Sequence, residues 1–108
     1  DGVAKGCHHI DIHQEGTKQV RIPIANGGSY DIPFRSLIPK TLKNVLVAGR
    51  CLSADRPAMG SARVMGSCLA MGQATGTAGA MFQSSVFAKR HNYIMVVIVK
   101  LGLLFHQK

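Results

Sequence analysis

Three histidines near the start of the chain could transfer protons or bind a metal. His8, His9 and His13 stand close together, with Asp11 between the second and the third. In a strand, alternate residues share a face, so His9 and His13 would lie together. Zinc needs three or four tetrahedral ligands, and neither a CxxC pair nor an HExxH helix anchors this set. We predict no metal here, and His13 is left as a candidate for proton transfer or as a solvated histidine on a sheet.

A glycine-rich stretch further along the chain has helical spacing. Apolar and small residues recur every three or four positions through residues 61–83, and Ser61 is placed to cap that helix. Several of the 12 glycines fall between Gly60 and Gly79, and each costs a helix roughly 1 kcal/mol relative to Ala. A helix with so many glycines usually allows close approach by another backbone or by a ligand. Both interpretations apply to different glycines of one helix.

The segments before this helix are predicted to be strands. Residues 8–13 and 18–24 alternate polar and apolar side chains, as half-buried strands do. Residues 26–29 (Asn-Gly-Gly-Ser) are a turn signal, because Asn and Gly tolerate positive φ. Residues 30–34 form a third candidate strand, which Pro33 places at a sheet edge or a strand end. Together these segments predict an antiparallel meander.

A continuous apolar run follows the meander. Val45–Gly49 shows no alternation of polar and apolar residues before it stops at Gly49-Arg50. Such a run is typical of a strand buried on both faces, as in a parallel sheet. The segment therefore predicts a change of architecture from the meander that precedes it.

Several motifs follow one another in a fixed order. They are Leu-Val-Ala-Gly-Arg at 46–50, Ser-Ala at 53–54, Gly-Ser-Ala-Arg-Val-Met at 60–65 and Ala-Met-Gly-Gln-Ala-Thr-Gly-Thr-Ala at 70–78, preceded by Ile-Asp-Ile-His at 10–13 and Tyr-Asp-Ile-Pro-Phe-Arg-Ser-Leu-Ile-Pro-Lys at 30–40. In this order they resemble the C-terminal end of the FAD-dependent oxidoreductase family, over residues 1 to about 82. The GxGxxG fingerprint, which binds the ADP half of FAD near the N-terminus of such proteins, does not occur in this sequence.

The resemblance implies a C-terminal piece of a larger oxidoreductase with a two-dinucleotide-binding-domain fold. The expected fold class is α+β, a fragment of an α/β FAD-binding fold: an antiparallel strand meander, one buried strand and a long Gly-rich helix. Residues 1–43 would belong to the substrate-covering region and residues 44–83 to the FAD-binding domain, while residues 84–108 are left unassigned. FAD is the implied cofactor. The implied partners are a missing N-terminal dinucleotide-binding portion of the same enzyme and a small-molecule substrate.

The resemblance also implies where the flavin lies. Gly49 would let the backbone approach the cofactor, and Arg50 would pair with a phosphate or a carboxylate. A helix beginning near Ser61 would aim its positive end at the flavin's pyrimidine edge. The residues expected to contact the flavin there, largely through backbone groups, are Ser61, Ala62, Arg63, Val64 and Met65. The catalytic candidates are His13, for substrate contact or proton transfer, and Arg35, for a substrate carboxylate. Structural pairing is the alternative for each arginine.

The formal net charge of +8 raises the question of an anionic partner. The basic residues are scattered, with no basic helix face and no aromatic platform, so we predict no nucleic-acid partner. A phosphate-bearing cofactor or a missing acidic half explains the charge as well. The alternative from another class is a small basic module that binds nucleic acid or an anionic membrane surface, and a third is a relic without activity. The apolar run near the C-terminus is shorter than the roughly 20 residues of a membrane span, so no transmembrane segment is predicted.

Overall fold

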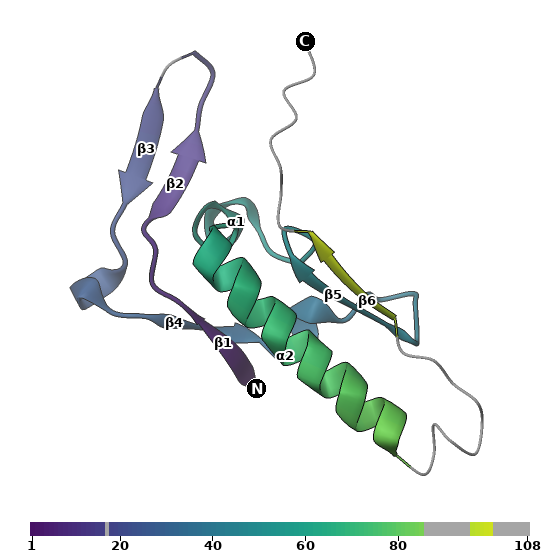
Figure 1. Ribbon diagram of the computed structural model, residues 1–108. Helices are drawn as coiled ribbons and strands as arrows, with labels where there is room; N and C mark the ends of the chain where they lie inside the picture. The colour runs from purple at the N-terminus through teal and green to yellow at the C-terminus, as the bar shows by residue number, and fades with distance from the viewer. Residues whose placement is uncertain (17, 86–95, 101–108) are drawn as a thin grey trace.

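The computed structural model describes residues 1–16, 18–85 and, for the backbone alone, 96–100. In chain order the elements are β1 (Gly2–Gly6), β2 (Ile10–His13), β3 (Gln19–Ile22), η1 (Ala25–Gly27), β4 (Tyr30–Pro33), η2 (Phe34–Leu37), β5 (Val45–Gly49), α1 (Arg56–Ala62), α2 (Met65–Ser84) and β6 (Val96–Lys100), where η marks a short 3-10 turn. Antiparallel strands, a buried strand and a long helix are all present, which confirms the predicted α+β fold class (Figure 1).

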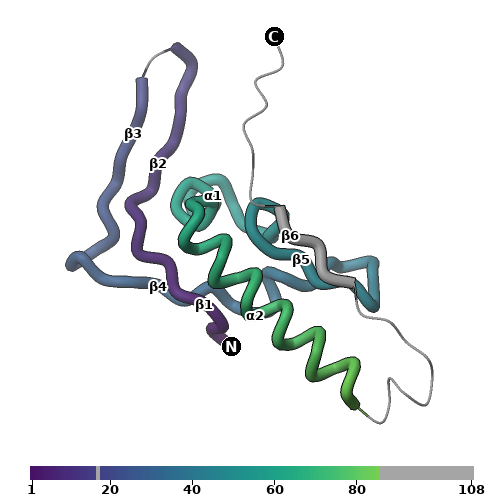
Figure 2. Tube along the Cα trace, viewed as in Figure 1, coloured from purple at the N-terminus to yellow at the C-terminus, as the bar shows by residue number. Residues whose placement is uncertain are grey.

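The first four strands form a bent hairpin. β2 pairs with β3 and β1 pairs with β4, both antiparallel. The chain therefore runs out along β1 and β2 and returns along β3 and β4, as the paired tube segments show (Figure 2). The sequence correctly predicted the antiparallel strands, but β4 pairs with β1 instead of following β3 in a meander.

Strand β1 escaped the sequence analysis because glycines occupy both of its ends. A Cβ on Gly6 would collide with the ring of Tyr30, its cross-strand partner on β4. The aromatic ring thus covers a strand glycine, a recurrent way to stabilise such a pair. Gly6 is needed at this position so that the Tyr30 ring can lie across β1.

Two helices replace the single helix that the sequence predicted over residues 61–83. Helix α1 ends at Ala62, Val64 has an extended backbone (φ −70°, ψ 154°), and α2 begins at Met65. The N-cap of α1 is Asp55, so the prediction that Ser61 caps a helix was wrong. Ser61 lies inside α1 with a buried side chain. Local helical spacing continues through residues 61–83, and it therefore could not reveal the break.

Strand β5 is covered by α2 and pairs in parallel with β6, which confirms a strand of a parallel sheet. Leu46 and Ala48 are 5% and 0% exposed, whereas Val45 and Val47 on the other face are half-buried. One face of β5 is thus fully covered within the described residues, and the other only in part.

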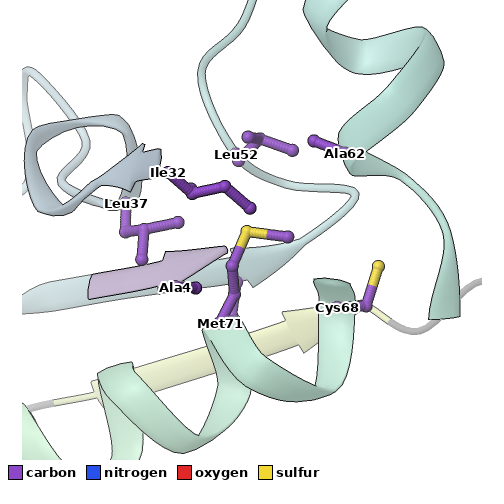
Figure 3. Packing of buried hydrophobic residues seen from close by; sticks show 8 residues of the cluster. Ala4, Ile32, Leu37, Leu52, Ala62, Cys68 and Met71 are labelled. Atoms are coloured by element: carbon purple, nitrogen blue, oxygen red, sulfur yellow. The ribbon is translucent and has the colours of Figure 1, made fainter. Parts of the chain in front are cut away.

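The core lies between α2 and the strands β1, β4 and β5. Its fully buried members include Leu37, Cys68 and Met71, each 0% exposed. Met71 projects from α2 toward Ile32 and Leu52, which come from β4 and from the loop after β5 (Figure 3). This packing fixes α2 against the strands and so sets the position of the corner between α1 and α2.

Most of the unassigned segment 84–108 lies outside the described residues, apart from the end of α2 and the backbone of β6. Among the described helices, none has both the length and the apolar character needed to cross a bilayer.

Candidate functional site

The turn after β5 forms one side of the candidate site. Gly49 has a φ of +67°, a left-handed conformation that only glycine adopts without strain. The Leu52 N–H closes the turn by donating to the Gly49 carbonyl oxygen at 3.1 Å. The chain therefore leaves the sheet abruptly, and Arg50 is exposed at the turn.

Arg50 connects this turn to the corner between the two helices. Its Nε donates to the Arg63 carbonyl oxygen at 3.4 Å, and the Cys68 thiol donates to the same oxygen at 3.4 Å. Burial raises the pKa of the Cys68 thiol, although nearby Arg50 partly opposes the shift, so the thiol keeps its proton at neutral pH. The structure thus brings Gly49 and Arg50 beside the segment that begins α2.

The N-terminus of α2 is open at this corner. Its N-cap residue, Val64, makes no side-chain hydrogen bond to the helix, and the first turn contains no acidic residue. Met65 is 70% exposed, and a Cβ on Gly66 would meet nothing within 4 Å. The first N–H groups of an α-helix lack partners within the helix, and that end carries a positive partial charge. This end can therefore receive an electron-rich group from outside the described residues.

The side chains of Ser61 and Ala62 do not line the corner. They are 1% and 2% exposed, respectively. The Ser61 hydroxyl donates to the His8 carbonyl oxygen, so at the 2.6 Å contact between the two hydroxyls Tyr30 must be the donor. Ser61 therefore fastens α1 to the hairpin, and a flavin contact through its backbone stays a prediction.

A cavity of about 250 Å³ lies next to the corner, between β2 and α1. The charged residues that line it are Arg56, Arg63 and Asp11. Arg56 Nη2 donates to the His13 carbonyl oxygen at 3.1 Å, and Arg63 Nη2 donates to the Asp11 carbonyl oxygen at 3.0 Å. The guanidinium of Arg63 thus holds β2, while its carbonyl belongs to the corner between α1 and α2.

Arg56 was missed by the sequence analysis. It stands seven residues before Arg63, and two helical turns place such residues on one face. That signal becomes visible only once a helix is known to begin after Asp55. An N-cap Asp followed by Arg56-Pro57 is itself a helix-start pattern.

The two catalytic candidates are not brought together. His13 is exposed at the end of β2, opposite Gln19, and it borders the arginine-lined cavity. Arg35 is exposed in η2, where its Nη1 pairs with the Asp1 carboxylate at 2.6 Å. Within the described part of the chain, no hydrogen bond or ion pair joins His13 to Arg35. Their catalytic roles stay predictions.

Comparison with known proteins identifies the class as a redox enzyme that uses a flavin cofactor. A family model described as FAD dependent oxidoreductase matches residues 1–90. The chain therefore belongs to the FAD-dependent oxidoreductase family, as its motifs indicated, and FAD is its cofactor. A search of curated proteins and a search of solved structures gave no match.

Proposed function

We propose that this chain forms the flavin-facing corner of an FAD-dependent oxidoreductase and is the C-terminal part of that enzyme. The observation that carries the proposal is the open N-terminus of α2, with no side-chain cap and no acidic residue in its first turn. A buried helix end without such partners would be unfavourable in a complete enzyme. The pyrimidine edge of a flavin offers the electron-rich atoms that this end lacks.

The residues at the start of α2 suit a flat ring system. A Cβ at Gly66 would meet nothing within 4 Å, so backbone groups can be approached closely there. Val64 and Met65 precede this position, and the exposed Met65 side chain offers an apolar surface beside it. The N–H groups here would donate to the flavin, and they overlap the C-terminal part of the predicted contact segment, which ran from Ser61 to Met65.

Bound FAD supplies the group that accepts or donates hydride or electrons. The positive end of α2 would stabilise negative charge at the pyrimidine edge, which favours the reduced cofactor and raises its redox potential. Arg50 adds a positive charge on the same side of the corner, since its guanidinium lies against the Arg63 carbonyl. Its other N–H groups are available for a phosphate or carboxylate, while Gly49 lets the backbone turn beneath them.

The proposal requires a dinucleotide-binding portion to hold the ADP half of FAD, because this chain has no GxGxxG fingerprint. That portion of the same enzyme, placed before this chain in a two-dinucleotide-binding-domain fold, would also cover apolar side chains that α2 exposes. Met65, Leu69 and Met81 are 70%, 58% and 68% exposed. Residues 1–43 would then cover a small-molecule substrate, and residues 44–83 would complete the FAD-binding domain.

An amide NMR titration of the 108-residue chain with FAD tests the proposed corner. We expect weak binding, because the ADP half has no site here, with the largest shifts at Val64, Met65 and Gly66. ADP is the matched control, since it lacks the flavin, and it should leave these amides unchanged. Equal shifts with ADP, or FAD shifts concentrated elsewhere on a folded chain, would contradict the proposal.

A further inference from the structure

The cavity between β2 and α1, which we call the arginine cavity, has walls that the flavin corner does not use. Arg56 and Arg63 line it together with Ile12 and Met59. The two arginines lie two helical turns apart, so their side chains leave the same side of α1. The cavity thus combines two guanidinium groups with an apolar surface.

Both guanidinium groups are held in place before any ligand arrives. Each spends one Nη2 donor on a carbonyl oxygen of β2, at 3.1 Å for Arg56 and 3.0 Å for Arg63. A guanidinium has five N–H donors in a rigid plane. The remaining donors are therefore oriented, and a planar fork of this kind matches the two oxygens of a carboxylate or phosphate.

No ion pair within the described residues neutralises either arginine of the cavity. The ion pairs found there join Lys5 to Asp31 and Arg35 to Asp1, so neither cavity arginine takes part in one. The acidic residue that lines the cavity is Asp11.

By strand alternation the Asp11 side chain belongs to the face of β2 opposite α1, and its Oδ1 is buried without a hydrogen-bond partner among the described residues. The side chains of Ile10 and Ile12 lie 3.3 and 3.4 Å from the position of a Cβ on Gly60, so they face α1. Alternate residues of a strand face opposite sides, which directs the Asp11 side chain to the other face, where its Oδ2 accepts from Gln19 at 2.7 Å. The Asp11 carbonyl oxygen accepts from Arg63, and within the described residues the Asp11 carboxylate makes no ion pair with either cavity arginine.

We propose that the arginine cavity binds the carboxylate or phosphate group of a small organic anion, and that this anion is the substrate. Its volume of about 250 Å³ suits a small molecule rather than a dinucleotide. Ile12 and Met59 would contact the carbon skeleton of the anion. Arg63 lines the cavity with its guanidinium and the flavin corner with its carbonyl, so a molecule bound here lies next to the redox site. The substrate role rests on the proposed function, whereas the anion site itself does not.

Arginine side-chain NMR on the 108-residue chain tests the anion site without any variant. Succinate and inorganic phosphate are the probes. We expect the Nε–H signals of Arg56 and Arg63 to shift together along one saturable curve. Arg21 is an exposed internal control, and its signal should stay nearly unchanged. Equal or unsaturable shifts at all three arginines would show general charge screening and overturn the proposal.

A pair of matched variants measures the contribution of the cavity. Arg56→Gln should weaken succinate or phosphate binding roughly tenfold or more, the usual effect of losing a hydrogen bond to a charged group. Arg21→Gln removes the same charge from β3 and should change binding less than twofold. Equal losses in both variants would overturn the proposal. If circular dichroism shows that the Arg56→Gln variant is unfolded, Arg56→Lys replaces it. Lysine keeps the positive charge but loses the planar fork, so this variant should still weaken binding.

Competition with FAD separates a substrate site from a cofactor site. FAD carries its pyrophosphate as a diester without a terminal phosphate, and we expect it not to displace succinate from the arginine cavity. Displacement would assign the cavity to the cofactor and overturn the substrate role. The flavin corner is tested separately by the amides of Val64, Met65 and Gly66. Loss of the FAD response with a retained anion response would therefore contradict the proposed function and leave the anion site standing.

Discussion

The two helices that meet at the corner begin in opposite ways. Helix α1 starts with Asp55, whose Oδ1 accepts from the Ala58 N–H at 2.8 Å, and it has a proline in its first turn. Helix α2 starts with Val64, which provides no side-chain cap. The shorter helix is thus closed by its own residues, while the longer one leaves its start to another group. The difference fits the proposal that the start of α2 faces the flavin, while α1 is closed by residues of this chain.

Two glycines show the same contrast. A Cβ on Gly60 would lie 3.0 Å from the Asp11 carbonyl oxygen and 3.3 Å from Ile10, so this glycine lets α1 pack closely on β2. A Cβ on Gly66 would meet nothing within 4 Å. One glycine therefore permits contact inside the chain, and the other leaves space for a partner. Close backbone packing is thus confirmed at Gly60, whereas approach by a ligand at Gly66 stays a prediction.

The largest expected effect comes from adding a side chain at Gly60, the glycine that packs closely on β2. Gly60→Val should lower the free energy of unfolding by about 1–3 kcal/mol, because its side chain would press on the β2 backbone, which cannot move aside as a flexible side chain can. Gly66→Val is the control and should change stability by no more than about 0.5 kcal/mol. Urea unfolding followed by circular dichroism measures both. Similar losses in the two variants would remove the contrast between these glycines.

Exchanging the two helix starts should give smaller effects of opposite sign. Asp55→Ala should destabilise the chain by about 1 kcal/mol through loss of its cap, and Val64→Asp should stabilise it by a similar or smaller amount by adding one. The new carboxylate would also occupy the N–H groups of α2 and repel negative charge there. We therefore expect Val64→Asp to abolish the FAD-induced shift at Gly66. A stabilised Val64→Asp variant that keeps this shift would show that the open start of α2 is not the flavin contact.

The smallest effect is expected outside both helix starts, in the exposed pair of Lys5 and Asp31. The hydrogen bond from Lys5 and its charge lower the pKa of the Asp31 carboxyl in the folded chain. A carboxyl whose pKa is lower in the folded than in the unfolded state stabilises the fold above its ordinary pKa, and this contribution is lost as the pH falls through the folded value. Lys5→Met should therefore raise the Asp31 pKa, as measured by carboxyl ¹³C NMR, and leave FAD and succinate binding unchanged. An unchanged Asp31 pKa would mean that the pair does not persist in solution.

Features encoded within a few neighbouring residues could be predicted. The continuous apolar run of Val45–Gly49 identified a strand of a parallel sheet, and alternation identified β2 and β3. The ordered motifs identified the family. Gly49 and Arg50 were singled out as site residues from the same motifs, and the structure places them beside the start of α2 through the contact of Arg50 with Arg63.

Features that depend on contacts between segments far apart in the chain could not be predicted from the sequence. Local spacing in residues 61–83 is helical throughout, yet the Ser61 hydroxyl bonds to His8, 53 residues away, and the helix breaks at Val64. Nothing local marked β1 as a strand either, because its pairing depends on the Tyr30 ring lying over Gly6. The partner of β4 was therefore predicted incorrectly.

By itself, then, the sequence determined the fold class, the family and the cofactor, because apolar periodicity and motif order are written in neighbouring residues. Only the tertiary structure decided which helix end is open, which glycine packs closely against a strand and which arginines share a cavity. Arg56 and Arg63 form that cavity because each bonds to a carbonyl of β2 across 43 and 52 residues of chain, respectively. Contacts over such separations depend on how whole elements pack, and no local pattern records them.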